Sequence, residues 1–346
     1  MNRVPVISVL MPAYNAAEFI SEAINSILSQ TFTDFELIII DDGSTDNTVQ
    51  IIQSYTDSRI VFIKNEVNLK LIKTLNKGIG LARGKYIARM DADDISLPER
   101  FEKQISIFDS YNGIDIVSTL SYIMSGDGGK IHQQLNIFPY NFETVRFISL
   151  FFPVITHPGV MVRASVFKGN HYLDSPSVLH VEDFELWNRL FVRRKCICYI
   201  LPKPYLMYRQ TVSSINSINR EQQKKKVCAL SLMYIKEETG YSISEETLRT
   251  INGLDKVCSL EKMRKAKAEI DKLQLIYKRK IPLSFVAEKE LKFAIRGILW
   301  LSWMYYFRSK KFCGILFSLY PLMYLSTTFR FLYTYIVSRI KMMNYV

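Results

Sequence analysis

Three aspartates gather within four residues at Asp91-Ala92-Asp93-Asp94, and this cluster is the strongest chemical signal in the sequence. Carboxylates this close repel one another, so a folded chain needs a counter-charge to hold them together. Carboxylate oxygens suit a hard divalent cation, Mg²⁺ or Mn²⁺, which is commonly shared with the phosphates of a substrate. The alternative is a solvated acidic turn before the helix predicted from Pro98, and the cluster alone does not decide between the two.

A second acidic pair, Asp41-Asp42, follows an apolar run and precedes Gly43-Ser44. Asp, Gly and Ser favour turns and helix caps, but that preference accounts for one residue, such as Ser44 or Asp46, and not for two carboxylates directly after the apolar run. A carboxylate at this position can accept hydrogen bonds from a base edge or from ribose hydroxyls, as in dinucleotide-binding folds. The first loop, Pro12–Asn15, has no glycine-rich phosphate-binding pattern, so a cation is needed to neutralise a bound diphosphate.

Short apolar runs alternate with helical patterns over the first hundred residues, which predicts an α/β fold. The predicted strands are Val6–Met11, Phe35–Ile40, Ile60–Ile63, Lys85–Met90 and Ile114–Thr119, and the main predicted helices are Ala17–Gln30, Leu69–Ala82 and Pro98–Tyr111. Strands that are apolar on both faces and separated by helices predict a parallel sheet covered on both sides. Such sheets bind ligands beyond the carboxyl ends of their strands, where all three loops are expected to lie.

In order and spacing, these motifs resemble the nucleotide-sugar-binding signatures of inverting glycosyltransferase family 2. The matching segments are Val9–Asn15, Asp41–Asp46, Asn76–Gly78, Ala82–Tyr86, Asp91–Asp94 and Pro98–Arg100. The resemblance covers roughly residues 5–210 and implies an α/β, Rossmann-like fold of the GT-A type. We therefore expect a catalytic domain over residues 1–215 and a mostly helical C-terminal region over 216–346.

The resemblance also implies roles for individual residues on the donor side. The residues that would bind the donor nucleotide are Pro12, Tyr14, Asp42, Asp91 and Asp93. The residues that would hold Mn²⁺ or Mg²⁺ are Asp93, Asp94 and His157. A lone histidine more often has a structural role, so the part of His157 in metal binding is the least specific of these expectations. Uracil is the expected base, with guanine and thymine left open.

On the acceptor side, Glu182-Asp183 resembles the acidic pair that opens a helix in the family. Asp183 would be the general base that removes a proton from the acceptor hydroxyl, which gives inversion by in-line displacement. Glu182, Trp187 and Arg189 would shape the acceptor pocket. Acidic residues in a first helical turn also interact favourably with the helix dipole, so the position of Asp183 alone does not establish catalysis.

The charge balance and the C-terminal tail suggest an anionic surface as a partner. Lys and Arg number 45 against 33 Asp and Glu, a formal charge of +12, and the mean hydropathy is +0.04. Phe312–Phe329 carries no charge but contains Pro321, which favours an interfacial or re-entrant membrane element over a clean span, with a buried helical hairpin as the alternative. We expect a peripheral protein on the cytoplasmic face of the cell membrane, acting on a glycan carried by undecaprenyl diphosphate in bacterial surface-polysaccharide synthesis.

Other function classes are less consistent with the sequence. A nucleotidyltransferase would need an early glycine-rich basic loop, and no motif supports nucleic-acid binding. The five cysteines lack metal-site spacing and are expected to be reduced thiols. The chain lacks the Gln-x-x-Arg-Trp motif of processive synthases, so one sugar per encounter is expected. A catalytically inactive sugar-nucleotide-binding scaffold at the membrane is the alternative to an enzyme.

Overall fold

The computed structural model describes residues 4–126, 128–129, 131–133, 141–210, 220–254 and 259–309. These residues group into two compact units. One lies within Met1–Gln134, Ile155–Leu186 and Arg194–Ser214, and the other within Leu135–Val154, Trp187–Arg193 and Ile215–Val346. The boundary predicted after residue 215 stays a prediction, but two earlier segments of the chain group with the helical unit.

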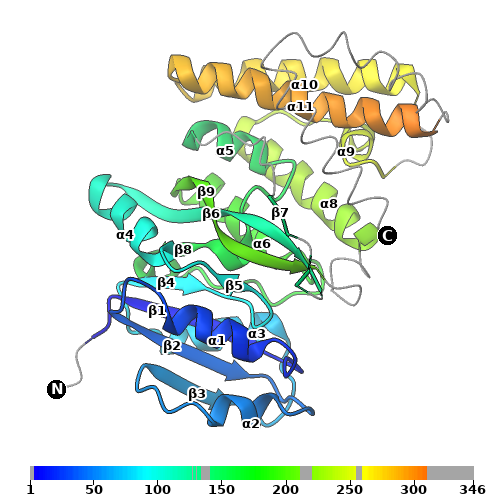
Figure 1. Cartoon of the computed structure of the whole chain (residues 1–346). Coiled ribbons are helices and arrows are strands. Elements are labelled where there is room, and N and C mark those ends of the chain that lie inside the picture. Colours follow the sequence, from blue (N-terminus) through cyan, green and yellow to red (C-terminus); the bar gives the residue numbers. More distant parts are fainter. Residues whose placement is uncertain are drawn as a thin grey trace. The chain divides into compact units, whose positions relative to one another are not determined.

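One mixed sheet forms the centre of the first unit. Its strand order is β3-β2-β1-β4-β8-β6-β9-β5, with β7 paired to β6, and Figure 1 shows β3, β2, β1 and β4 as neighbours in that order. The strands are β1 Ile7–Ala13, β2 Phe35–Asp41, β3 Ile60–Lys64, β4 Tyr86–Arg89, β5 Ile95–Ser96, β6 Ile114–Ser125, β7 Ile131–Gln133, β8 Met161–Arg163 and β9 Ile197–Gln210.

The expectation of a parallel sheet is correct for β1 to β4, which pair in parallel. The sheet continues with strands that the sequence did not predict: β8 runs antiparallel to both β4 and β6, and β5 and β7 run antiparallel to β9 and β6. Antiparallel neighbours need no helical crossover between them, so such short strands can be added by loops alone. The three-residue β8 follows a 3₁₀ turn at His157–Gly159 in this way.

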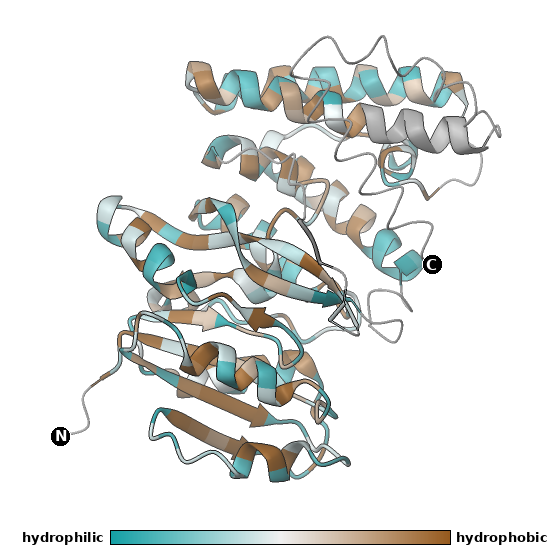
Figure 2. Ribbon diagram, in the orientation of Figure 1, coloured by the Kyte–Doolittle hydropathy of each residue, from teal (hydrophilic) through white to brown (hydrophobic). Residues whose placement is uncertain are grey.

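Helices cover both faces of the parallel strands, as the alternation of side chains along β1 requires. Ile7, Val9 and Met11 belong to one buried cluster together with Ile20 and Ile24 of α1 (Ile20–Leu28). On the other face, Leu10 and Ile40 lie so close to Gly78 of α3 (Leu71–Leu81) that a Cβ there would approach both at 3.3 Å. Figure 2 shows β2 and β3 as largely apolar ribbons. The two remaining helices of this region are α2 (Thr48–Gln53) and α4 (Arg100–Ser110).

The described residues of the second unit form helices and their connections. The helices are α5 (Phe142–Ser149), most of α6 (Glu182–Arg193), α8 (Arg220–Thr239), α9 (Glu245–Ile251), α10 (Leu260–Lys280) and α11 (Phe285–Ser309). Arg146 of α5 forms a buried ion pair with Glu238 of α8 at 2.5 Å, and Tyr277 of α10 donates to the Glu143 carbonyl at 2.7 Å. Ser244 and Ser259 accept backbone hydrogen bonds as N-caps of α9 and α10.

The apolar tail at Phe312–Phe329 and the polar segment at 213–219 lie outside the described residues. Among the helices that the structure does describe, none combines the length and hydropathy needed to span a membrane.

Candidate active site

The loops after β1, β2 and β4 meet at one edge of the sheet. Ala13, the last residue of β1, pairs with Asp41 of β2, and the Asp42 amide donates to the Ala13 carbonyl at 2.8 Å. β4 runs parallel to β1 and ends at Arg89, just before the aspartate cluster. The three loops therefore lie at the carboxyl ends of neighbouring parallel strands, where the sequence placed them.

Hydrogen bonds tie the loop after β1 to the loop after β2. Asn15 has a positive φ of 48°, donates its amide to Ser44 Oγ at 2.9 Å, and accepts from the Thr45 amide at 2.8 Å. Tyr14 is 49% exposed next to this fixed point. Pro12 lies in β1 beyond Leu10, the last residue that pairs with β4. An exposed aromatic ring on an anchored loop offers a flat surface on which a base can stack.

Asp42 is buried and anchors a third loop at the same edge. Its Oδ1 accepts from Asn65 Nδ2 at 2.8 Å and from the Leu69 amide at 2.9 Å, and its Oδ2 accepts from the Lys70 amide at 2.9 Å. Sequence reasoning missed Asn65, which lies one residue after β3 and has no motif around it. Asp42 is thus a structural anchor of this edge, and its predicted contact with a base stays a prediction.

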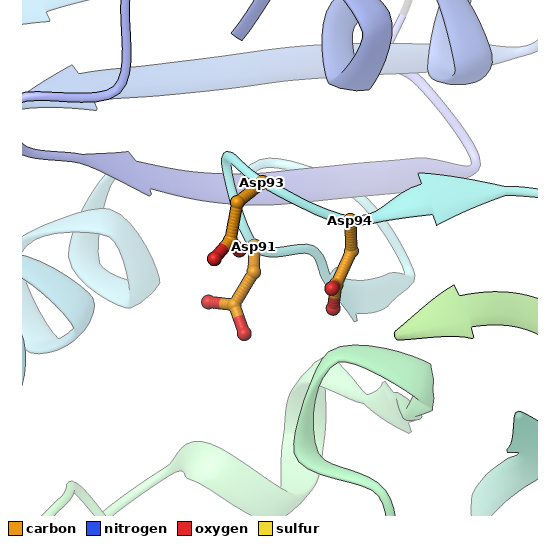
Figure 3. Close-up of side chains that lie close together, drawn as sticks. All are labelled: Asp91, Asp93 and Asp94. Carbon is orange, nitrogen blue, oxygen red and sulfur yellow. The ribbon is translucent and has the colours of Figure 1, made fainter. Parts of the chain in front are cut away.

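The carboxylates of Asp91, Asp93 and Asp94 come together on the turn after β4. One oxygen from each lies within 4.8 Å of the others, and Figure 3 shows all three extending from the turn in the same direction. Asp94 is 1% exposed; its Oδ1 accepts from the Arg209 amide at 2.8 Å, while Oδ2 has no hydrogen-bond partner among the described residues. A buried carboxylate oxygen without a partner fits a position that a cation would fill.

The electrostatics of the cluster point the same way. Burial together with the charge of Asp91 raises the pKa of Asp93 to about 6, and burial with the charges of Asp91 and Asp93 raises the pKa of Asp94 well above its usual range. Arg89 forms an ion pair with Asp91 and is itself buried. The charges of Arg89 and Arg209 lower the pKa of Asp93, but burial and the charge of Asp91 outweigh them, so a divalent cation would favour the ionised cluster.

Arg209, at the end of β9, positions the cluster from 115 residues away in the sequence. Its Nε donates to the Asp93 carbonyl at 2.8 Å, and one terminal nitrogen donates to Glu22 at 2.5 Å. The guanidinium also lies 4.4 Å from the centre of the Phe19 ring. Sequence reasoning missed this residue because no local pattern connects it with Asp93 and Asp94.

The structure does not bring His157 into the aspartate cluster. Among the described residues, the only group of acidic, histidine or cysteine side chains with metal-site spacing is Asp91, Asp93 and Asp94. Nε2 of His157 is instead hydrogen-bonded to the Tyr172 hydroxyl at 2.6 Å. Burial, with the nearby charge of Arg89, holds the pKa of His157 well below its usual value, so the ring is neutral. In this structure His157 contacts Tyr172, and its predicted metal contact stays a prediction.

Glu182 and Asp183 form the first turn of α6, in the same unit as the cluster. Burial raises the pKa of Asp183. The charge of Arg89 lowers this pKa and the charge of Asp91 raises it, so Asp183 at the start of α6 interacts electrostatically with residues at the end of β4. Burial and the charge of Asp183 raise the pKa of Glu182 to about 7. Two carboxyl groups with raised pKa values at the start of one helix are typical of general-base sites.

Trp187 and Arg189 lie further along α6 and group with the second unit. Trp187 is 3% exposed, and Arg189 is half-buried. Their predicted contact with an acceptor stays a prediction.

Comparison of the sequence with known families gives a clear match. Residues 8–169 match the model of glycosyl transferase family 2. An uncharacterized glycosyltransferase of Haemophilus influenzae is 32% identical over 254 residues, which are 70% of this chain and 78% of the relative. The putative glycosyltransferase EpsE of Bacillus subtilis is 34% identical over 195 residues, 55% of this chain and 68% of the relative.

Two solved structures of similar fold contain a bound nucleotide sugar. The structure of Staphylococcus aureus TarS 1–349 in complex with UDP-GlcNAc is similar with a TM-score of 0.56 at 18% identity, and the match covers 88% of each chain. The mannosyltransferase PcManGT from Pyrobaculum calidifontis, in complex with GDP-Man and Mn²⁺, is similar with a TM-score of 0.52 at 12% identity and the same coverage. At these identities the likeness is one of fold.

Proposed function

The chain belongs to glycosyltransferase family 2, and we propose that it transfers one sugar from a nucleotide-diphosphate donor to a hydroxyl of a glycan acceptor with inversion at the anomeric carbon. The observation that carries the proposal is the cluster of Asp91, Asp93 and Asp94 beside the acidic start of α6. A cation site and a carboxylate base in one unit are the two elements that this reaction needs.

In this proposal the donor lies across the carboxyl edge of β1, β2 and β4. Tyr14 packs against the base, with Pro12 beneath it, and Asp42, which anchors the loop after β3, lies at the polar edge of the base. Asp93 and Asp94, with Asp91, are the residues that would hold Mn²⁺ or Mg²⁺. When bound there, the cation would supply positive charge that stabilises the departing nucleoside diphosphate. The unpartnered Oδ2 of Asp94 and the raised pKa of Asp93 support this assignment.

Asp183 acts as the general base. As the acceptor oxygen forms its bond to the anomeric carbon, the hydroxyl proton passes to the Asp183 carboxylate, and the bond from that carbon to the diphosphate oxygen breaks. A carboxylate with a raised pKa is a stronger base than an ordinary aspartate, which favours this proton transfer. Glu182 lies next to Asp183 and is proposed to contact the acceptor.

UDP is the proposed nucleotide. The UDP-GlcNAc bound to TarS supports uracil, whereas the GDP-Man bound to PcManGT leaves guanine as the competing possibility. PcManGT also contains Mn²⁺, which supports the proposed cation. The acceptor is proposed to be lipid-linked, on undecaprenyl diphosphate at the cytoplasmic face of the membrane, because the chain carries a formal charge of +12.

A transfer assay with matched variants tests the proposal. Purified protein is incubated with radiolabelled UDP-, GDP- or dTDP-sugars, Mn²⁺ and lipid-linked glycan extracted from membranes. We expect transfer from one nucleotide class, no transfer by Asp93→Ala, and donor binding without transfer by Asp183→Asn. Donor binding without transfer by the unmodified protein, across acceptors that other family members use, would instead indicate the inactive scaffold.

A further inference from the structure

Apolar side chains are exposed to solvent in the last turns of α10 and the first turn of α11. Phe285 is 72% exposed, Val286 is 59% exposed, and Leu275 near the end of α10 is 60% exposed. Among the described residues, no large apolar side chain is more exposed than Phe285. Phe285 and Val286 are adjacent, so two large apolar side chains are exposed together at the start of α11.

Basic side chains accompany these apolar ones at helical spacing. Arg279 follows Leu275 by four residues on α10, and Lys289 follows Phe285 by four residues on α11, so each pair shares a helix face. Lys289 Nζ lies 4.2 Å from the centre of the Phe285 ring. Each cation therefore lies beside an exposed apolar group on the same helix.

The positive charge of this segment is not balanced locally. Residues 272–292 include six basic and two acidic side chains. Both acids are engaged: Glu288 pairs with Lys278 at 2.6 Å, and Glu290 accepts from the Asn141 amide at 3.2 Å. Within the part of the chain that the structure describes, no carboxylate lies within ion-pair distance of Arg279 or Lys289.

The charge decides which partner fits. Residues 310–346, which follow α11, contain five basic residues and no acidic one, so they do not supply the missing negative charge. A symmetric contact with a second copy would bring the same cations together. An anionic bilayer supplies negative headgroups for the cations and an apolar layer for the three exposed side chains.

We propose that Leu275, Arg279, Phe285, Val286 and Lys289, the α10–α11 patch, form a docking surface for an anionic lipid bilayer. The inference deepens the membrane location in the proposed function and rests on that location, but not on the donor chemistry. The patch places the lipid contact on folded helices, in addition to any contact made by the tail.

Vesicle binding by the full chain tests the patch. The probes are vesicles of phosphatidylcholine alone and of phosphatidylcholine with phosphatidylglycerol, with binding measured by flotation. Each cation near an anionic surface contributes about 1 kcal/mol, so Arg279→Gln/Lys289→Gln should weaken binding to the anionic vesicles about 25-fold. Phe285→Ser/Val286→Ser should weaken it by about tenfold or more.

The control removes the same charge from the other end of α10. Lys262 lies about 25 Å along the helix from Arg279. We expect Lys262→Gln/Lys265→Gln to weaken binding to the anionic vesicles less than threefold. Equal losses in Arg279→Gln/Lys289→Gln and Lys262→Gln/Lys265→Gln would overturn the proposal, as would unchanged binding by either of the two patch variants. Tryptophan emission added by Phe285→Trp should be quenched by brominated lipid, and absence of quenching would also refute it. Nucleotide-sugar binding by the same variants should be unchanged, which separates this test from that of the proposed function.

Discussion

Replacement of Glu182 by glutamine is expected to stabilise the fold at alkaline pH while weakening the acceptor site. Glu182 is 9% exposed, and one of its carboxylate oxygens has no hydrogen-bond partner among the described residues. Its pKa rises from 4.5 to about 7 because of burial and the adjacent charge of Asp183. The folded protein therefore keeps a proton that the unfolded chain releases, and stability falls as pH rises from about 4.5 to about 7.

The magnitude follows from the size of this shift. Each pKa unit corresponds to 1.36 kcal/mol, so ionised Glu182 destabilises the fold by about 3 kcal/mol above pH 7. Glutamine has nearly the same shape and stays neutral at every pH. Glu182→Gln should therefore be more stable than the unmodified protein by about 2–3 kcal/mol at pH 8, and nearly equal to it at pH 4.5.

Urea unfolding at a series of pH values measures this difference. Both proteins are unfolded in EDTA, so that no bound cation contributes, and the midpoints are compared at equal slope. A stability difference that does not change between pH 4.5 and pH 8 would refute the reasoning, as would a variant that is less stable at pH 8. A gain in stability together with a raised KM for the acceptor is the pattern expected of a strained functional residue.

Three further predictions concern Asp183, the two glycines Gly80 and Gly84, and Arg209. Asp183→Asn should lower kcat by a factor of about 10²–10⁴ while donor affinity is retained. In the unmodified enzyme, kcat/KM should fall as the pH drops below the raised pKa of Asp183. A fall in kcat/KM centred at or below the ordinary aspartate pKa of 3.8 would count against Asp183 as the base. Gly84→Ala should lower the free energy of unfolding by about 3 kcal/mol or more, because a Cβ there would lie 2.6 Å from the Ser8 amide nitrogen. A Cβ at Gly80 would have no atom within 4 Å, so Gly80→Ala should leave the stability unchanged or raise it, as measured by thermal unfolding. Arg209→Lys should lower Mn²⁺ affinity at least tenfold in calorimetry, since a lysine does not reproduce the hydrogen bonds to Asp93 and Glu22; an unchanged affinity would show that Arg209 does not position the cluster.

Strands β1 to β4 and helices α1, α3 and α4 could be predicted because each of them carries its own pattern. The β2 segment Phe35–Ile40 is a continuous apolar run, and the aspartates follow the strand ends directly. The second half of the fold offers no comparable signal. β8 has three residues, too few for a period to be visible, and β9 contains Pro202 and Pro204, which argue against a strand in sequence.

The candidate site divides in the same way. Asp91, Asp93 and Asp94 are adjacent in sequence, so their proximity needed no knowledge of the fold. Arg209 and Asn65 reach the site only through strand pairing across the sheet, and a single sequence does not contain that information. His157 is a different case: its residue type suggested a metal ligand, which stays a prediction. Its hydrogen bond to Tyr172, itself held by Asn76 of α3, is a contact that only the fold reveals.

Calorimetry of nucleotide binding tests the central claim, a cation-dependent nucleotide-sugar site on the aspartate cluster, most directly. UDP-, GDP- and dTDP-sugars are titrated into the full chain with Mn²⁺, then with EDTA, and then into Asp93→Ala with Mn²⁺. We predict micromolar binding of one nucleotide class that is lost both in EDTA and in the variant. Binding of equal strength in all three conditions, or no binding to a protein whose fold is intact, would contradict the account.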